Sequence, residues 1–181
     1  RYFIFFVLEE LERYRLPPEL ALLPYIESNY DPFSISASGA MGIWQFMPAT
    51  ARIYGLKDTW WYEQRHDPLV SSKAAVRYLA YLHNRFNKEI TYTLAAYNGG
   101  PTLLEKRIKL NKKANKPTNY ENLKLPKQTQ EYVPKFKAIV ELVINAEKYG
   151  INLPNFPNEK VLSNIELDGQ VEILAFSEFA G

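Results

Sequence analysis

The sequence predicts a mainly α-helical single domain that ends in a short irregular or β-containing tail. Three observations predict this fold class. Apolar residues recur at helical spacing in several segments, proline and glycine separate those segments, and the pattern fades after residue 150. With 181 residues and an apolar fraction of 46%, the chain is long enough for one domain with a full core. We expect residues 1–150 to form the domain and residues 151–181 to be an extension that packs on it.

The first predicted helix covers residues 3–15 and is amphipathic. Its apolar residues stand at helical spacing: Phe3, Phe6, Val7, Leu11 and Tyr14. Pro17 and Pro18 end it, and Pro18 suits the first turn of a second helix over residues 19–28. Leucine and isoleucine surround most of that second helix, so we expect it to be buried. Residues 29–42 are rich in Ser, Gly, Asp and Pro and are expected to form a tight loop.

Capping signals bound the helices in the middle of the chain. A short helix is expected after Pro48. Asp67 can cap a long helix over residues 69–86, with Pro68 at its first position. An apolar segment at 90–97 ends at a strong breaker, Asn98-Gly99-Gly100-Pro101, and helix is expected again over 102–110.

The last predicted helix covers residues 128–149 and follows a loop at 111–127. Gly150 stands where the glycine after a helix belongs. Pro134 must lie near the first turn of this helix or kink it. Beyond it, residues 161–167 are compatible with a strand, and 170–180 fit neither pattern.

Composition narrows the classes of partner and cofactor. The formal net charge is +2, which is too small to indicate a nucleic-acid partner. The chain has no cysteine and two histidines, His66 and His83, so we expect no disulfide, no metal and no other cofactor. His66 is expected to support the Asp67 cap and His83 to lie in the core. The basic residues between 106 and 116 are expected to form a solvated helix face.

Glu27 is unusual because it is a carboxylate on the apolar second helix. Burial there would raise its pKa and give a proton donor near neutral pH, although position alone favours a structural glutamate. A conventional glycosidase needs a second carboxylate about 5 to 10 Å away. No Asp or Glu occurs between Asp31 and Asp58, and Asp31-Pro32 more naturally starts a turn. The pattern favours a mechanism with one carboxylate.

Neutral hydrogen-bonding groups and aromatic rings gather in the sequence around Glu27 and the breaker at Asn98. They are Ser28, Tyr30, Ser36, Ser38, Trp44, Gln45, Tyr97 and Asn98. Amides and hydroxyls pair with sugar hydroxyls and N-acetyl groups, and aromatic faces pack on pyranose rings. This composition suits an uncharged glycan better than a phosphate.

A long motif resembles a known family. Residues 24–51 read Pro-Tyr-Ile-Glu-Ser-Asn-Tyr-Asp-Pro-Phe-Ser-Ile-Ser-Ala-Ser-Gly-Ala-Met-Gly-Ile-Trp-Gln-Phe-Met-Pro-Ala-Thr-Ala. This run resembles the core of the lytic transglycosylases, relatives of goose-type lysozyme, and especially the branch of membrane-bound lytic murein transglycosylase D. Further motifs match in order: Ala96 to Gly100, Arg65-His66-Asp67-Pro68, Glu131-Tyr132-Val133-Pro134 and, more loosely, Gly169 to Ile173.

The resemblance implies a lysozyme-like compact helical domain with a substrate cleft, and a peptidoglycan-cleaving enzyme. Glu27 would protonate the oxygen between N-acetylmuramic acid and N-acetylglucosamine. It would then take the proton of the muramic acid C6 hydroxyl, which attacks C1 to give a 1,6-anhydro sugar. The family's other site residues map onto Tyr97, which would hydrogen-bond the glutamate or the cleaved sugar, and onto Asn98 and Gln45, which would contact substrate.

The resemblance also assigns lesser roles around the cleft. Ser36 and Ser38 match serines that line and orient the acid, and Ser28 is a further candidate for substrate contact. Met41, Trp44 and Phe46 either line the saccharide cleft or belong to the core.

Two other functions stay open at this point: a lysozyme-like muramidase, and a non-catalytic peptidoglycan-binding scaffold. The implied partners are peptidoglycan glycan strands and other cell-wall enzymes, and the basic run could also attract anionic stem peptides. The implied location is the bacterial cell envelope, in the periplasm or anchored to the outer membrane. The chain begins at Arg1 rather than Met, so we expect a targeting segment or lipid anchor to precede it.

Overall fold

The computed structural model describes residues 3–155, 157, 159–161 and 172, and it is mainly α-helical. Its elements, with η for a 3-10 helix, are α1 (Ile4–Arg13), η1 (Pro18–Leu22), α2 (Leu23–Ser28), α3 (Pro48–Ile53), η2 (Gln64–His66), α4 (Pro68–Arg85), α5 (Ile90–Gly99), α6 (Pro101–Lys113), η3 (Tyr120–Asn122), α7 (Lys127–Ile144) and η4 (Glu147–Tyr149). In the described part of the chain, β-structure is limited to isolated bridges such as Met41 with Phe46. The prediction of a mainly α-helical fold is therefore confirmed.

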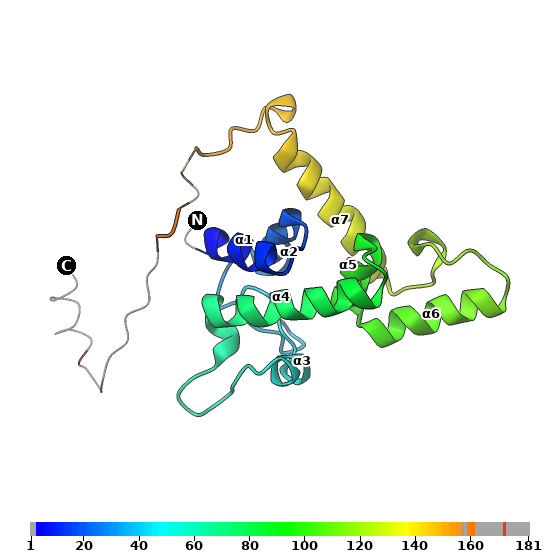
Figure 1. The fold of residues 1–181 in the computed structure, drawn as a ribbon, viewed down its shortest axis with the longest axis horizontal. Helices are drawn as coiled ribbons and strands as arrows, with labels where there is room; N and C mark the ends of the chain where they lie inside the picture. Colours follow the sequence, from blue (N-terminus) through cyan, green and yellow to red (C-terminus); the bar gives the residue numbers. More distant parts are fainter. Residues whose placement is uncertain (1–2, 156, 158, 162–171, 173–181) are drawn as a thin grey trace.

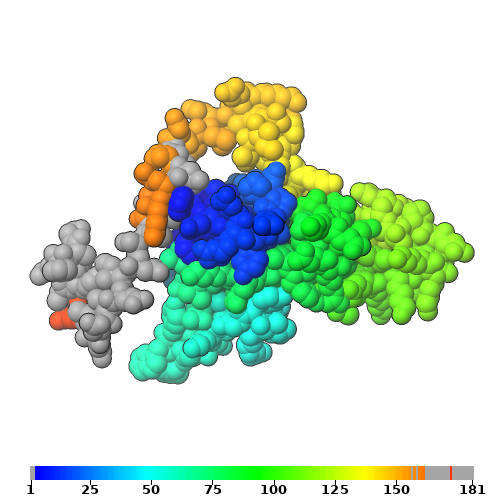
Figure 2. All heavy atoms as spheres, in the orientation of Figure 1, coloured from blue at the N-terminus to red at the C-terminus, as the bar shows by residue number. Residues whose placement is uncertain are grey.

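Helix α4 lies at the centre of the fold. It packs against both α1 and α5, and α5 also contacts α6 and α7 (Figure 1). The core forms where these helices meet, from fully buried side chains such as Val7, Leu11, Leu79, Leu82 and Leu94. In Figure 2, α6 and the segment that follows it project as a lobe from this body. Among the described residues, no helix is long and apolar enough to cross a membrane.

The predicted cap of the long central helix is confirmed. Asp67 Oδ1 accepts hydrogen bonds from the backbone N–H groups of Leu69 and Val70, at 2.9 and 3.0 Å. Pro68 occupies the first position of α4, where no intrahelical N–H bond is required. We expected His66 to support this cap, but it does not. Its Nδ1 instead lies 2.7 Å from the carbonyl oxygen of Pro32, which ties the loop after α2 to the start of α4.

The predicted second helix is divided into η1 and α2. Pro24 lies in the first turn of α2. It has no N–H, and its ring would clash with the carbonyl of Leu20 in a continuous α-helix, so the chain forms a 3-10 turn before it. Asn29, in the left-handed conformation with φ 55°, ends α2. Glu27 is thereby fixed in the last turn of a six-residue helix.

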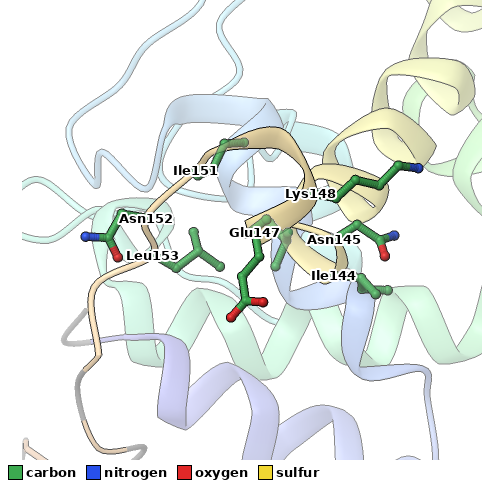
Figure 3. A pocket seen from close by; sticks show the side chains of 9 residues that line it. Ile144, Asn145, Glu147, Lys148, Ile151, Asn152 and Leu153 are labelled. Carbon is green, nitrogen blue, oxygen red and sulfur yellow. The ribbon is translucent and has the colours of Figure 1, made fainter.

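Helix α7 ends at Ile144, five residues before the predicted end. A turn and η4 follow, and Gly150 closes η4 with a positive φ of 65°. Pro134 lies inside α7 rather than in its first turn, so the carbonyl of Gln130 lacks its intrahelical partner. Residues 143–153 fold into a hook around a cavity of about 490 Å³ (Figure 3).

The described residues after Gly150 are exposed. The segments predicted at 161–167 and 170–180 lie outside the described residues, apart from Val161 and Glu172. The division into a domain at 1–150 and an extension that packs on it stays a prediction.

Candidate active site

Glu27 is half-buried, and its carboxylate receives a hydrogen bond from α7, far from it in sequence. The hydroxyl of Tyr132, in α7, donates to Glu27 Oε1 at 2.5 Å. Burial raises the pKa of Glu27 above its ordinary value, while the Tyr132 hydrogen bond and the charge of Lys135 act in the opposite direction. The expectation that burial raises this pKa is confirmed. Glu27 can therefore hold a proton at a higher pH than an exposed glutamate.

The carboxylate of Glu27 opens into a cavity of about 580 Å³. The cavity is bounded by α2, the loop after it, the end of α5 and the first turns of α7. Its lining residues are Ile26, Glu27, Ser36, Gln45, Asn98, Lys127, Gln128, Glu131, Tyr132 and Lys135. We call it the catalytic cavity. Of the predicted site residues, it brings together Glu27, Ser36, Gln45 and Asn98.

A second cavity of about 270 Å³ adjoins the first. Gln45 and Asn98 line both cavities, so they stand at the junction between the two. The second cavity is lined further by Tyr78 and Tyr97 and by residues at the start of α3. The two cavities together offer room on both sides of the Gln45–Asn98 pair.

A tight turn at Gly42 presents Gln45 to both cavities. Gly42 has φ +77°, and a Cβ atom there would lie 1.8 Å from the carbonyl oxygen of Arg65. Only glycine fits this close approach. Gln45 has φ 49°, and its Nε2 donates to the carbonyls of Ser34 and Gly42 at 3.2 and 3.0 Å. The amide nitrogen is thus held by the loop, which leaves the amide oxygen as an acceptor for a ligand.

Arg65 anchors this turn from beneath. Its side chain is buried and pairs with Glu63 at 2.6 Å. The same guanidinium donates to the carbonyls of Gly39 and Phe46 at 3.1 and 3.4 Å. Phe46 itself is a buried core residue. The Arg65-His66-Asp67-Pro68 motif therefore supports the site through the backbone of the loop.

For Tyr97 and Trp44, the structure distinguishes between alternatives that the sequence left open. The Tyr97 hydroxyl donates to the carbonyl of Trp44 at 2.8 Å and is not bonded to Glu27. Burial is the main cause that raises the pKa of Tyr97, and the negative charge of the nearby Glu27 raises it further. The Trp44 side chain is 1% exposed, and its Nε1 donates to Ser72 Oγ at 2.8 Å. Trp44 is therefore a core residue rather than a cleft residue.

Three other predicted residues lie outside both cavities. The Ser28 hydroxyl faces the carbonyls of Pro24 and Ile43 at 3.3 and 3.1 Å and ties α2 to the loop. Ser38 is exposed in the turn beside Ser36, with their hydroxyl oxygens 3.0 Å apart. Met41 is half-buried and forms isolated β-bridges to Ile35 and Phe46, in two other parts of the loop. These residues shape the loop that carries Ser36 and Gln45.

Asn98 is positioned by α7. Its Oδ1 accepts from Thr129 Oγ1 at 2.9 Å. A Cβ atom on Gly99 would lie 2.9 Å from the same hydroxyl, so glycine there permits α5 to approach α7 closely. With its oxygen engaged, Asn98 keeps its amide N–H groups for the cavity.

Asp31 has the structural role that we expected. Its Oδ1 accepts from the backbone N–H of Phe33 at 2.9 Å, which stabilises the turn after α2. It lines neither cavity. In the described part of the chain, no group of three or more His, Asp or Glu residues is placed to hold a metal ion. The arrangement suits proton transfer by Glu27 to a neutral, hydroxyl-rich ligand.

The motifs gave no indication that α7 contributes to the site. Tyr132 stands in the Glu131-Tyr132-Val133-Pro134 motif, but no site role was predicted for it. Lys127, Glu131 and Lys135 were not proposed at all, although all three line the catalytic cavity. Their spacing of four residues along α7, which places them on one face, was the available signal.

Residues 6–120 match the family described as the Transglycosylase SLT domain. The chain belongs to this family. The match includes Glu27, Gln45, Tyr97 and Asn98 and ends before α7. The resemblance inferred from the motifs is thereby confirmed.

Comparison of this SLT domain with known proteins extends the likeness to α7. Over 179 residues it is 36% identical to the membrane-bound lytic murein transglycosylase D of Escherichia coli (strain K12). The matched region covers 99% of this chain and 40% of that protein. The chain thus spans about two fifths of the length of this relative.

Two solved structures share the fold of the SLT domain. One is an inactive mutant of the lytic transglycosylase Slt from Pseudomonas aeruginosa, with TM-score 0.60 and 23% identity over 77% of this chain and 24% of that one. The other is a soluble lytic transglycosylase from Escherichia coli, with TM-score 0.56 and 21% identity over 76% of this chain and 24% of that one. At these identities the likeness concerns the fold.

Proposed function

We propose that this SLT domain is a peptidoglycan lytic transglycosylase with Glu27 as its general acid and base. The observation that carries the proposal is the environment of Glu27: a carboxyl with a raised pKa that opens into a cavity beside neutral amide and hydroxyl groups. Membership of the SLT family and the name of the Escherichia coli relative support the same activity.

The first step would break the β-1,4 bond between N-acetylmuramic acid C1 and the oxygen of N-acetylglucosamine. Glu27 gives its proton to that oxygen as the bond breaks. The electron pair of the C1–O bond stays on the leaving oxygen. The Tyr132 hydroxyl, which donates to Oε1, stabilises the carboxylate that forms. The substrate's own acetamido group can stabilise the positive charge at C1 from the other face.

The second step would use the same carboxylate as a base. Glu27 removes the proton of the muramic acid C6 hydroxyl while the oxygen of that hydroxyl forms a bond to C1. The product is a 1,6-anhydro sugar, Glu27 is protonated again, and no water is consumed. Burial raises the pKa of Glu27 and the Tyr132 hydrogen bond lowers it, so the two effects together suit a group that must both give and take a proton.

The sugars would be held by residues at the junction of the two cavities. The Gln45 amide oxygen can accept from an N-acetyl N–H or a hydroxyl, and the Asn98 amide can donate to a carbonyl or hydroxyl oxygen. Ser36 lines the same cavity and adds a hydroxyl. Tyr97 would act by holding the backbone of Trp44, next to Gln45.

The place of action would be the bacterial cell envelope, because that is where peptidoglycan lies. The Escherichia coli relative is named as membrane-bound, which supports this location. Action in the periplasm, attachment to the outer membrane through a segment before Arg1, and association with other cell-wall enzymes are parts of the same proposal.

A muramidase activity is the second candidate function, and the position of Glu131 favours it. A hydrolase needs a carboxylate to activate water, and Glu131 lines the catalytic cavity with Glu27. However, Glu131 is exposed, and its Oε1 lies 3.7 Å from Lys127 Nζ. We therefore assign it no chemical step, and a Glu131→Gln variant should still release anhydro ends and no reducing ends.

The direct test is digestion of purified sacculi followed by mass spectrometry of the released fragments. The proposal predicts 1,6-anhydro ends, each lighter by one water than the corresponding lysozyme product. Glu27→Gln should keep the fold, seen by circular dichroism, and release no fragments. Fragments with reducing ends alone would favour the muramidase, and binding without cleavage by the wild type would favour a scaffold.

A further inference from the structure

The catalytic cavity holds cations that cleavage of an uncharged glycan does not require. Lys127, Glu131 and Lys135 follow one another at intervals of four residues, so their side chains share one face of α7. All three line the cavity. Lys135 is close enough to Glu27 for its charge to lower the pKa of that carboxyl.

The two lysines differ in their partners. Lys127 Nζ lies 3.7 Å from Glu131 Oε1. Among the described residues, no carboxylate lies within 4.0 Å of Lys135 Nζ. Lys135 is exposed at the edge of the cavity, and when Glu27 holds the proton that it needs as an acid, no described carboxylate is paired with the Lys135 charge.

The position of Lys135 also works against Glu27 as a proton donor. A positive charge beside an acid favours the ionised form, so Lys135 by itself makes Glu27 less able to keep its proton. Lys137, two residues further along α7, is exposed as Lys135 is, but it does not line the catalytic cavity. Lys137 lines a separate groove beside Leu20 and Phe136.

We propose that Lys135, with Lys127 beside it, forms a carboxylate subsite of the catalytic cavity that binds an anionic group carried by the glycan. The inference rests on the proposed function for the identity of the glycan. Two sources share this chemistry. One is the lactyl carboxylate of muramic acid in strands without peptides, and the other is a carboxylate of the stem peptide in strands that carry one. A neutral N-acetylglucosamine polymer offers neither.

Occupation of this subsite has a consequence for the acid. The charged or titratable groups near Glu27 are Tyr97 and Tyr132, which are neutral at physiological pH, the Lys127–Glu131 pair and Lys135. A carboxylate paired with Lys135 offsets the charge that lowers the pKa of Glu27. Binding of an anionic strand would therefore help Glu27 to keep its proton until the bond breaks.

The test measures binding in a Glu27→Gln background, where nothing is cleaved and the side chain resembles the protonated acid. Three probes are compared: glycan strands with stem peptides, amidase-treated strands with free lactyl carboxylates, and an N-acetylglucosamine hexamer. Lys135→Gln should weaken binding of an anionic probe by roughly two- to fivefold at low salt, the range for an exposed ion pair. The difference should shrink as salt increases, and Lys135→Arg should restore binding.

Lys137→Gln is the matched control, because it removes the same charge from the same helix outside the cavity. It should leave the affinity for all three probes unchanged. Loss of affinity with peptide-bearing strands alone would identify the stem peptide, and loss with amidase-treated strands would identify the lactyl group. Equal effects of Lys135→Gln and Lys137→Gln, or equal loss with the neutral hexamer, would overturn the inference.

The outcome is separable from that of the proposed function. If the wild type releases anhydro fragments but Lys135→Gln binds every probe normally, the subsite fails and the activity stands. If the wild type never cleaves sacculi but Lys135→Gln binds anionic strands more weakly, the subsite stands and the activity fails.

Discussion

Replacing Tyr132 with phenylalanine removes the hydroxyl that donates to Glu27 and keeps the ring that packs in the core. The lost bond is a 2.5 Å hydrogen bond to a carboxylate. A hydrogen bond to a charged group contributes about 1.5–3 kcal/mol, and about 1.4 kcal/mol corresponds to one pKa unit. Because the Tyr132 bond lowers the pKa of Glu27, its removal should raise that pKa.

The effect is measured from the rate of fragment release from sacculi as a function of pH. In the proposed mechanism cleavage begins with protonated Glu27, so activity should fall as pH rises above its pKa. The alkaline limb of the profile should move to higher pH in Tyr132→Phe. The maximal rate should fall by roughly 10- to 100-fold, because the carboxylate formed in the first step loses its stabilising donor.

Tyr92→Phe is the matched control for this experiment. The Tyr92 hydroxyl donates to the carbonyl of Thr118 at 2.6 Å, which is a comparable bond outside both cavities. Its removal should leave the limb in place. If the limb of a folded Tyr132→Phe variant also stays in place, Tyr132 does not tune Glu27 and the reasoning is refuted.

Two further predictions concern stability. The folded-state pKa of Glu27 is raised above 4.5, so its protonation favours the fold at low pH, and this contribution is lost as pH rises through the folded pKa. The unfolding free energy of Glu27→Gln relative to wild type should therefore increase from about pH 4.5 upward, and a pH-independent difference in urea melts would contradict this. Gly42→Ala places a Cβ atom 1.8 Å from the Arg65 carbonyl oxygen and should lower the free energy of unfolding by more than about 4 kcal/mol. Gly39→Ala is also at positive φ, but nothing lies within 4 Å of its Cβ position, so it should lower the free energy of unfolding by about 1–2 kcal/mol. Equal losses in the two glycine variants would show that the close approach at Gly42 is not restrictive.

The parts of the fold that local chemistry determines were predictable from the sequence. Asp67 and Pro68 define the start of α4 because a capping side chain and the missing N–H of proline act within one turn. The division of the second helix at Pro24 was missed because the leucines around it satisfy the helical pattern on both sides. The early end of α7 was missed for the same reason, since the apolar spacing continues past Ile144 into residues that form the hook.

The candidate site was predictable where its residues lie in motifs and less so where they depend on distant packing. Glu27, Gln45 and Asn98 do line the catalytic cavity. Tyr132 is 105 residues from Glu27, so spacing along the chain gives no indication that the two meet. The place of Trp44 stayed open because an aromatic residue beside a polar motif suits a sugar site or a core equally well, and burial decides between them.

In the proposed mechanism one carboxyl, Glu27, both protonates the leaving oxygen and activates the C6 hydroxyl, so that water takes no part in cleavage. The most direct measurement is digestion of sacculi in water enriched in oxygen-18, with lysozyme as the hydrolytic control. We expect the control to incorporate the label at C1 of the new ends. The fragments released by this SLT domain should carry anhydro ends without label, and labelled reducing ends would contradict the claim.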